Sequence, residues 1–245
     1  MARTCHKQFP LLVLLFFLAA APALFAQSSR AGHSGAVSLS ALGEYDCNAT
    51  YGSQANFDLL ADVPVGERFD CQPAVQFASA GIYSAALQAR TLFPVGKGCI
   101  YLKDRFLFRD IARSNMYDAC LGASVGYYRP HLEAELGMFG RFMDALDRNW
   151  HSLDGIMCEP FNCMYTLKGL LRPAGSGWNV SLALTNVDLF QMERMWQPIF
   201  ILGGNWDCSE RLEILADIVC KPTGMFHLNA ETYSLTARAG ITYRF

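Results

Sequence analysis

The sequence is short of charge and of long apolar runs, and each shortage excludes a class of protein. Only 17% of its 245 residues are charged, against about 25% in an average soluble domain. Beyond residue 26 it has no uninterrupted apolar stretch of roughly 18 residues, so we expect no membrane-spanning helix. It also lacks a basic excess, and its net charge of −2 argues against nucleic-acid binding.

What the sequence does have is a wealth of apolar and aromatic side chains. Hydrophobic residues make up 52% of the chain, which includes 17 Phe, 10 Tyr and 4 Trp. Such a composition excludes a disordered chain. Two classes remain: a globular domain with a well-buried core, and a barrel whose apolar outer face meets lipid.

Residues 1–26 have the parts of a secretory signal peptide. A positively charged start and the apolar segment 11–21 lead to small residues, with cleavage after Ala26 favoured over Ala23. An N-terminal membrane anchor is the weaker alternative, because the apolar run is short for a span and is bracketed by prolines. We therefore expect an export signal at 1–26 and one domain at 27–245.

Cysteine is plentiful but is not spaced for metal binding. The sequence has no C-x-x-C motif and no cysteine pair with nearby histidines, so it predicts no metal site. An even count in an exported chain is compatible with disulfides of unspecified connectivity; small buried or lipid-facing thiols are an equal alternative. The eight cysteines after the predicted signal are Cys47, Cys71, Cys99, Cys120, Cys158, Cys163, Cys208 and Cys220.

The clearest periodicity lies in the last fourteen residues, where apolar and polar side chains alternate strictly. This period of two predicts a strand with one apolar and one polar face. Tyr233 and Tyr243 lie ten residues apart on the apolar face, which is about 25 Å along the normal of a membrane for a tilted strand. The residues of the apolar face are Tyr233, Leu235, Ala237, Ala239, Ile241, Tyr243 and Phe245.

The same alternation recurs over most of the chain and predicts an all-β, antiparallel, up-and-down transmembrane β-barrel. Together with the C-terminal strand, the predicted strands number ten, within a range of eight to twelve. The other nine are 37–45, 53–63, 75–93, 117–127, 131–142, 161–171, 178–189, 198–206 and 209–219.

The segment 99–109 fits this pattern poorly. It places Asp104 on its apolar parity and Arg105 and Arg109 on the other. If it were a strand, the total would be eleven, whereas bacterial single-chain barrels have an even number. We therefore interpret 75–93 and 99–109, with the tip between them, as a hairpin that projects beyond the bilayer.

Short and long connections alternate along the chain, as in hairpins that cross a membrane and are elaborated on one side only. Short ones are predicted at Arg129-Pro130, at 172–176 and at Asp207-Cys208, and long ones at 143–160, 190–197 and 220–231. If the final strand ends in the periplasm, Cys71 and Cys208 lie at the periplasmic end and Cys120 in the wall. The cysteines expected on the outside are Cys47, Cys99, Cys158, Cys163 and Cys220.

With its signal peptide, its dyad-alternating strands and its C-terminal Thr-Tyr-Arg-Phe at 242–245, the chain resembles the outer-membrane β-barrel proteins of diderm bacteria. The small OmpA-, OmpX- and OmpW-like barrels are the nearest in size, and the many cysteines are compatible with a spirochaetal source. The resemblance implies that outer-membrane lipid surrounds the chain. It also implies that Phe245 helps the barrel-assembly machinery to recognise it.

Strand parity places charges of both signs on the inner face. Mixed signs favour a packed polar interior over a selective pore, which would carry a ring of one sign; a conducting or ligand-carrying lumen is the alternative. The predicted inner charges are Arg90, Arg141, Lys168, Arg211, Arg238, Arg244, Glu44, Asp58, Asp62, Asp118, Glu133, Glu135, Glu213 and Asp217.

Two predicted outer loops are rich in large apolar side chains. One hypothesis is a greasy entrance for a hydrophobic small molecule; the alternative is an interfacial aromatic belt, where Trp and Tyr are enriched anyway. The candidate ligand-binding residues are Trp150, Phe190, Met192 and Trp196.

The sequence also bears on the class of function. His151, Ser152 and Asp154 lie close in sequence, but adjacency is not catalytic geometry and no G-x-S-x-G motif occurs. We therefore predict a non-enzyme without catalytic residues or cofactors. The favoured function is a narrow pore, carrier or binder for small molecules, and the alternative is an adhesin that binds a host surface ligand through its extracellular loops.

Replacement of both Trp150 and Trp196 by alanine tests the greasy entrance. If the two rings form it, uptake of an apolar solute into proteoliposomes falls in the double variant. Unchanged uptake by a normally folded variant contradicts the hypothesis.

Overall fold

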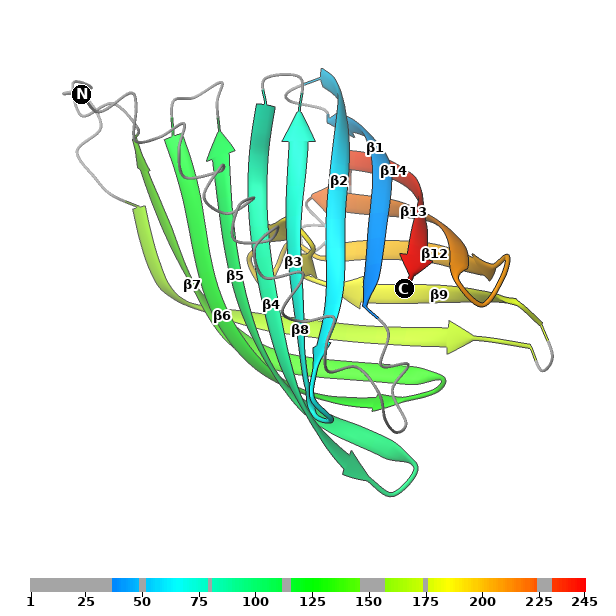
Figure 1. Cartoon of the computed structure of the whole chain (residues 1–245). Helices are drawn as coiled ribbons and strands as arrows, with labels where there is room; N and C mark the ends of the chain where they lie inside the picture. The colour runs from blue at the N-terminus through cyan, green and yellow to red at the C-terminus, as the bar shows by residue number, and fades with distance from the viewer. Residues whose placement is uncertain are drawn as a thin grey trace.

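The computed structural model describes residues 37–48, 52–78, 81–111, 116–145, 157–173, 176–223 and 231–245. Twelve strands of this part form a closed antiparallel barrel, in which each strand pairs with its neighbours in the chain and the first strand pairs with the last (Figure 1). The predicted all-β, up-and-down class is confirmed. The proposed signal peptide lies outside the described residues.

The barrel strands are mostly ten to fifteen residues long. Their bounds are β1 (Ser38–Asn48), β2 (Gly52–Val65), β3 (Phe69–Ala78), β4 (Gly81–Val95), β5 (Gly98–Ile111), β6 (Met116–Arg129), β7 (Leu132–Ala145), β8 (Met157–Leu171), β9 (Trp178–Thr185), β12 (Ile199–Asp207), β13 (Leu212–Thr223) and β14 (Glu231–Arg244). Two very short strands, β10 (Val187–Asp188) and β11 (Gln191–Met192), form a separate hairpin. No helix in the described segments is long and apolar enough to cross a membrane.

The two ends of the barrel differ. Tight turns at 66–68, 96–97, 130–131 and 208–211 lie at one end, which we call the turn end; the opposite end is the loop end. Gly66 and Gly96 adopt positive φ angles of 73° and 59° in their turns, a conformation that costs glycine little.

The walls show the inside-out arrangement that the alternation predicts. On β14, Leu235 and Ile241 are exposed on the outer surface while Thr236 and Arg238 are buried. On β6, Leu121 and Val125 are exposed and Asp118 and Ser124 are buried. Because the exposed parity is the apolar one, the outer surface presents a hydrophobic band and the polar groups line the lumen.

The number of strands differs from the ten expected, for two reasons. The segment 75–93 contains the end of β3 and most of β4, which pair with each other as antiparallel neighbours; Phe77, for example, lies opposite Ile82. The segment 99–109 is a full wall strand, β5, paired with β4 on one side and β6 on the other. Its Asp104 is exposed on the outer face, between its register partners Ala89 and Ala123.

This change moves one cysteine. Cys99, the second residue of β5, lies at the turn end and not at the loop end as expected. Cys71 and Cys208 lie near the turn end as expected. All eight cysteines from Cys47 to Cys220 are free thiols in the structure.

Close packing inside the wall requires a glycine at position 126. Tyr101 is fully buried and is the register partner of Gly126. A Cβ at residue 126 would overlap the ring of Tyr101. The Tyr101 ring cannot swing away freely, because its hydroxyl donates hydrogen bonds to Glu133 (2.7 Å) and Glu135 (3.1 Å).

Gly126→Ala should therefore destabilise the barrel by about 1–3 kcal/mol, the usual cost of overpacking. Urea unfolding of the refolded protein measures the change. Gly169→Ala on β8 is the matched control, since nothing lies within 4 Å of a Cβ built there. Equal stability of the two variants would contradict the packing argument.

Candidate functional site

The lumen is the candidate site, and its size follows from the strand count. Twelve strands spaced ~4.8 Å apart and tilted by ~40° enclose a cylinder with a backbone radius of about 12 Å. Inward side chains fill much of that radius, so the remaining passage depends on how they are arranged.

A buried ionic cluster surrounds Glu135 on β7. This carboxylate accepts hydrogen bonds from Lys103 (2.8 Å), Arg105 (2.8 Å) and Ser124 (2.7 Å). Glu135 is 2% exposed, so its charge is compensated by cations of β5 and not by water. Lys103 also lies 4.9 Å from the centroid of the Tyr101 ring.

A second cluster lies nearer the loop end. Asp118 accepts hydrogen bonds from Arg109 (2.8 Å) and Arg141 (2.7 Å), so two guanidinium groups share one buried carboxylate. A simpler pair, Arg90 with Asp70 at 2.8 Å, joins β3 and β4.

Charges at the turn end link the ends of four strands, β8, β12, β13 and β14. Arg244 pairs with Asp207 (3.1 Å) and with Glu213. Asp207 also accepts from Arg172 at 2.9 Å. These pairs are more exposed than those around Glu135 and Asp118.

The inner face of β1 and β2 is acidic. Glu44 accepts from the side chain of Asn56 at 2.7 Å, and Asp46 accepts from Ser234 at 2.6 Å and from Thr236. Asp58 is fully buried on the adjacent strand. The lumen therefore has an acidic sector opposite strands that carry paired charges.

The chain between β9 and β12 narrows the lumen. After Thr185 it forms the hairpin 186–193, built from β10, a turn and β11. Asn186, fully buried, anchors the base: its side-chain amide donates to the carbonyls of Cys163 and Glu193, both at 2.8 Å, and its Oδ1 accepts from the amide of Tyr165. Asn186 thus replaces a strand residue beside β8.

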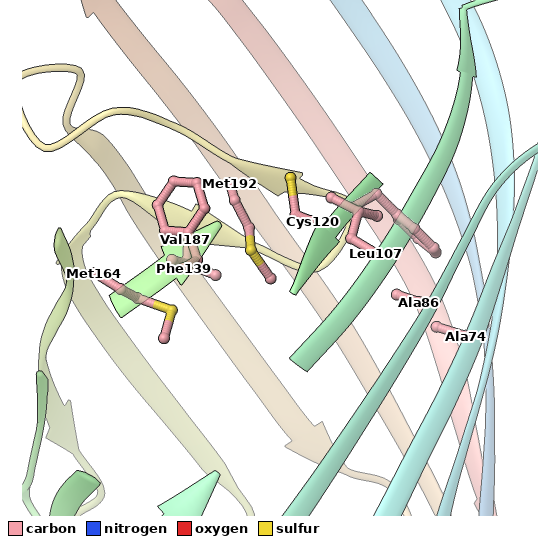
Figure 2. Packing of buried hydrophobic residues seen from close by; sticks show 9 residues of the cluster. Ala74, Ala86, Leu107, Cys120, Phe139, Met164, Val187 and Met192 are labelled. Carbon is pink, nitrogen blue, oxygen red and sulfur yellow. The ribbon is translucent and has the colours of Figure 1, made fainter. Parts of the chain in front are cut away.

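One side of the hairpin packs on an apolar ladder on the inner wall (Figure 2). We use this name for five successive register partners on β2 to β6, together with Phe139 and Met164 on the next two strands. The hairpin contributes Val187, Phe190 and Met192 to the same buried cluster. The five register partners are Leu60, Ala74, Ala86, Leu107 and Cys120.

An ion pair and a hydrogen bond hold the hairpin to the opposite wall. Asp188 pairs with Arg238 of β14 at 3.1 Å, and Gln191 accepts a hydrogen bond from Lys221 of β13. Arg238 also pairs with Asp217 at 2.7 Å. The hairpin therefore bridges the lumen, with apolar contacts on one side and charged contacts on the other.

Most of the predicted inner charges do point into the lumen. Only Arg211 differs clearly, because it is exposed in the turn 208–211. Sequence reasoning missed the inner residues of β5, since that segment was not placed in the wall, and those of the hairpin. The missed charges are Lys103, Arg105, Arg109, Asp188 and Lys221, with Asp46 on β1 and Asp70 on β3.

The candidate ligand-binding residues are separated. Phe190 and Met192, expected at an outer mouth, are 4% and 5% exposed inside the lumen; they pack there because the loop that carries them folds inward. Trp196 is 55% exposed and does not join them. Trp150 lies outside the described residues. Within the described segments, no group of three His, Cys, Asp or Glu side chains is placed to hold a metal ion.

No protein-family model matches the sequence, and no curated protein is significantly similar to it. Solved structures do share the fold. The KdgM porin, in complex with disordered oligogalacturonate, matches with a TM-score of 0.54 and 10% identity over 85% of this chain and 99% of that chain. An outer membrane channel from Pseudomonas putida F1 matches with 0.54 and 10% identity, over 90% and 98%.

The translocator domain of the autotransporter NalP from Neisseria meningitidis is also similar, with a TM-score of 0.51 and 14% identity over 98% of this chain and 99% of that one. The three similar structures are thus a porin, a channel and a translocator that share one barrel fold. At these identities the likeness shows the fold alone: this chain has the fold of the bacterial outer-membrane β-barrels.

The ionic cluster around Glu135 should contribute strongly to stability. Glu135→Ala leaves Lys103 and Arg105 buried without their shared partner, which typically costs about 3–5 kcal/mol. Urea unfolding in lipid or detergent measures the loss. Glu210→Ala, in the exposed turn 208–211, is the same substitution without burial and should change stability by less than about 1 kcal/mol; similar losses in both would contradict the assignment.

Proposed function

We propose that the protein is a narrow pore of the bacterial outer membrane for small solutes, in which the hairpin 186–193 forms the constriction. The observation that carries the proposal is the hairpin's position across the lumen, fixed by Asp188 to Arg238 and by Phe190 and Met192 to the apolar ladder. A barrel of about 12 Å backbone radius has room for water, and the inward hairpin reduces that room.

The location rests on the outer surface. Exposed apolar side chains surround the barrel, and Trp178 and Trp206, which are register partners near the turn end, are both exposed. Such aromatic residues are typical of the membrane interface. We infer that the turn end faces the periplasm and the loop end the exterior, as in short-turn, long-loop barrels.

Small solutes are the proposed cargo. The balanced charges argue against strong selection by ion sign, because a selective pore carries a ring of one sign. The KdgM porin, which has a similar fold, is described with an oligogalacturonate; this supports a pore-like role. The alternative, adhesion through the extracellular loops, depends on segments such as 146–156 and 224–230 that lie outside the described residues.

Planar-bilayer recordings test the constriction. Replacement of residues 187–192 by a short Gly-Ser linker removes the hairpin while Asn186 keeps its contacts with β8, so single-channel conductance should rise several-fold. A folded variant that conducts no better than the parent would contradict the proposal. Heat-dependent mobility in SDS gels establishes that each variant is folded.

A point substitution tests the ionic contact alone. Asp188→Ala frees the hairpin from Arg238, which keeps Asp217 as a partner, so the variant should show more frequent open events than the parent. Asp217→Ala is the matched control, because it removes the other partner of the same arginine and leaves the Asp188 contact in place. Identical gating in the two variants would contradict the role of Asp188.

A further inference from the structure

The barrel wall is lower between β8 and β13 than elsewhere. β9 has 8 residues and β12 has 9, whereas β8 has 15. Eight residues rising ~3.4 Å each at a tilt of ~40° cover about 20 Å, less than the ~25 Å apolar band of a membrane barrel. On the loop-end side, therefore, paired strand does not fill the wall here.

The shortness of β9 leaves part of β8 without a paired neighbour. β8 pairs with β9 only from Thr166 to Leu171, although it pairs with β7 up to Met157. Beside residues 157–165 lies the segment 186–198. We call the region between residues 157–165 of β8 and the segment 186–198 the seam.

The seam is closed by side chains and not by a strand ladder. Asn186 satisfies backbone groups of Cys163 and Tyr165, and the Tyr165 hydroxyl donates to the carbonyl of Met195 at 3.2 Å. Arg194 pairs with Glu159 near the loop end of β8. Such contacts rearrange more easily than a continuous ladder, because few backbone hydrogen bonds must break.

Apolar side chains line the seam on both sides of the wall. Phe161 is 77% exposed on the outer parity of β8, and Met195 and Trp196 of the adjoining segment are 50% and 55% exposed. Inside, Met164 is fully buried and contacts the cluster that contains Phe139 and Met192. Met164 follows Phe161 by only three residues on the same strand, so the outer and inner apolar groups are neighbours across the wall.

We propose that the seam is a lateral portal through which a single-chain fatty acid passes between the outer leaflet and the apolar ladder of the lumen. The inference rests on the proposed membrane location and names a further solute class for the pore. The acyl chain suits the apolar lining, and methionine side chains adapt to a flexible ligand. The carboxylate suits Arg194, a partly exposed guanidinium of the seam, where it would replace Glu159 as the ion-pair partner.

Photo-crosslinking of the full barrel in phospholipid vesicles tests the portal. The probe is dodecanoate with a diazirine in mid-chain, and the competitor is excess unmodified dodecanoate. Peptide mass spectrometry should find adducts at Phe161, Met164, Met192 and Trp196 that the competitor suppresses. Adducts elsewhere on the apolar band should persist, because bulk lipid contact does not saturate.

Matched variants locate the entry. Trp196→Glu puts a carboxylate in the seam and should lower the adduct yield at Met164 and Met192 about tenfold. A tenfold loss corresponds to only a small part of the free energy needed to desolvate a carboxylate. Trp206→Glu makes the same change on the outer face of β12 near the turn end and should leave both yields unchanged. Heat-dependent mobility in SDS gels checks the folding of both.

Three results would overturn the portal. The first is labelling that the competitor does not suppress, which indicates only lipid contact, and the second is an equal effect of the two substitutions. The third is adducts at Met164 and Met192 without any at Phe161 and Trp196, which indicates entry from the open loop end. Failure of the proposed pore can be told apart from failure of the portal. If removal of residues 187–192 does not raise conductance, but the unaltered barrel still shows labelling that the competitor suppresses, the constriction is wrong and the portal is supported.

Discussion

The backbone hydrogen-bond ladder, closed into a ring, is the constraint on which the rest of this molecule depends. A strand in contact with hydrocarbon has no water to satisfy its amides and carbonyls, so each edge must find another edge. Closure gives every strand one outward and one inward parity, and contact with hydrocarbon favours the apolar parity outside. A largely apolar composition thereby forms a hydrophobic exterior and an ionic interior.

The period of two was enough to predict this architecture, because alternation is a local property of the sequence. The strand count was harder, and two segments explain why. In 75–93 the outward parity is the same before and after the β3–β4 connection, so two strands were interpreted as one. Once 75–93 is taken as one strand, adding β5 makes the count odd; with Asp104 also on the outer face, the sequence favours leaving that segment out of the wall.

The site was only partly predictable, for a related reason. Parity alone identifies inner charges such as Arg141, Glu135 and Arg238, but not their partners, which depend on the register between strands. The apolar loop residues Phe190 and Met192 fit an exposed mouth and an inward hairpin equally well. What distinguishes these alternatives is the complementary apolar ladder, and its small residues Ala74 and Ala86 become neighbours only when β3 and β4 pair.

The pairing of β1 with β14 carries a consequence for biogenesis. Ser38 lies opposite Arg244, and the amide of Phe245 donates to the carbonyl of Val37 at 3.0 Å. The ring therefore cannot close until β14, the last strand along the sequence, pairs with β1. Until then every partly folded intermediate has two unpaired strand edges, and such edges favour aggregation with other chains.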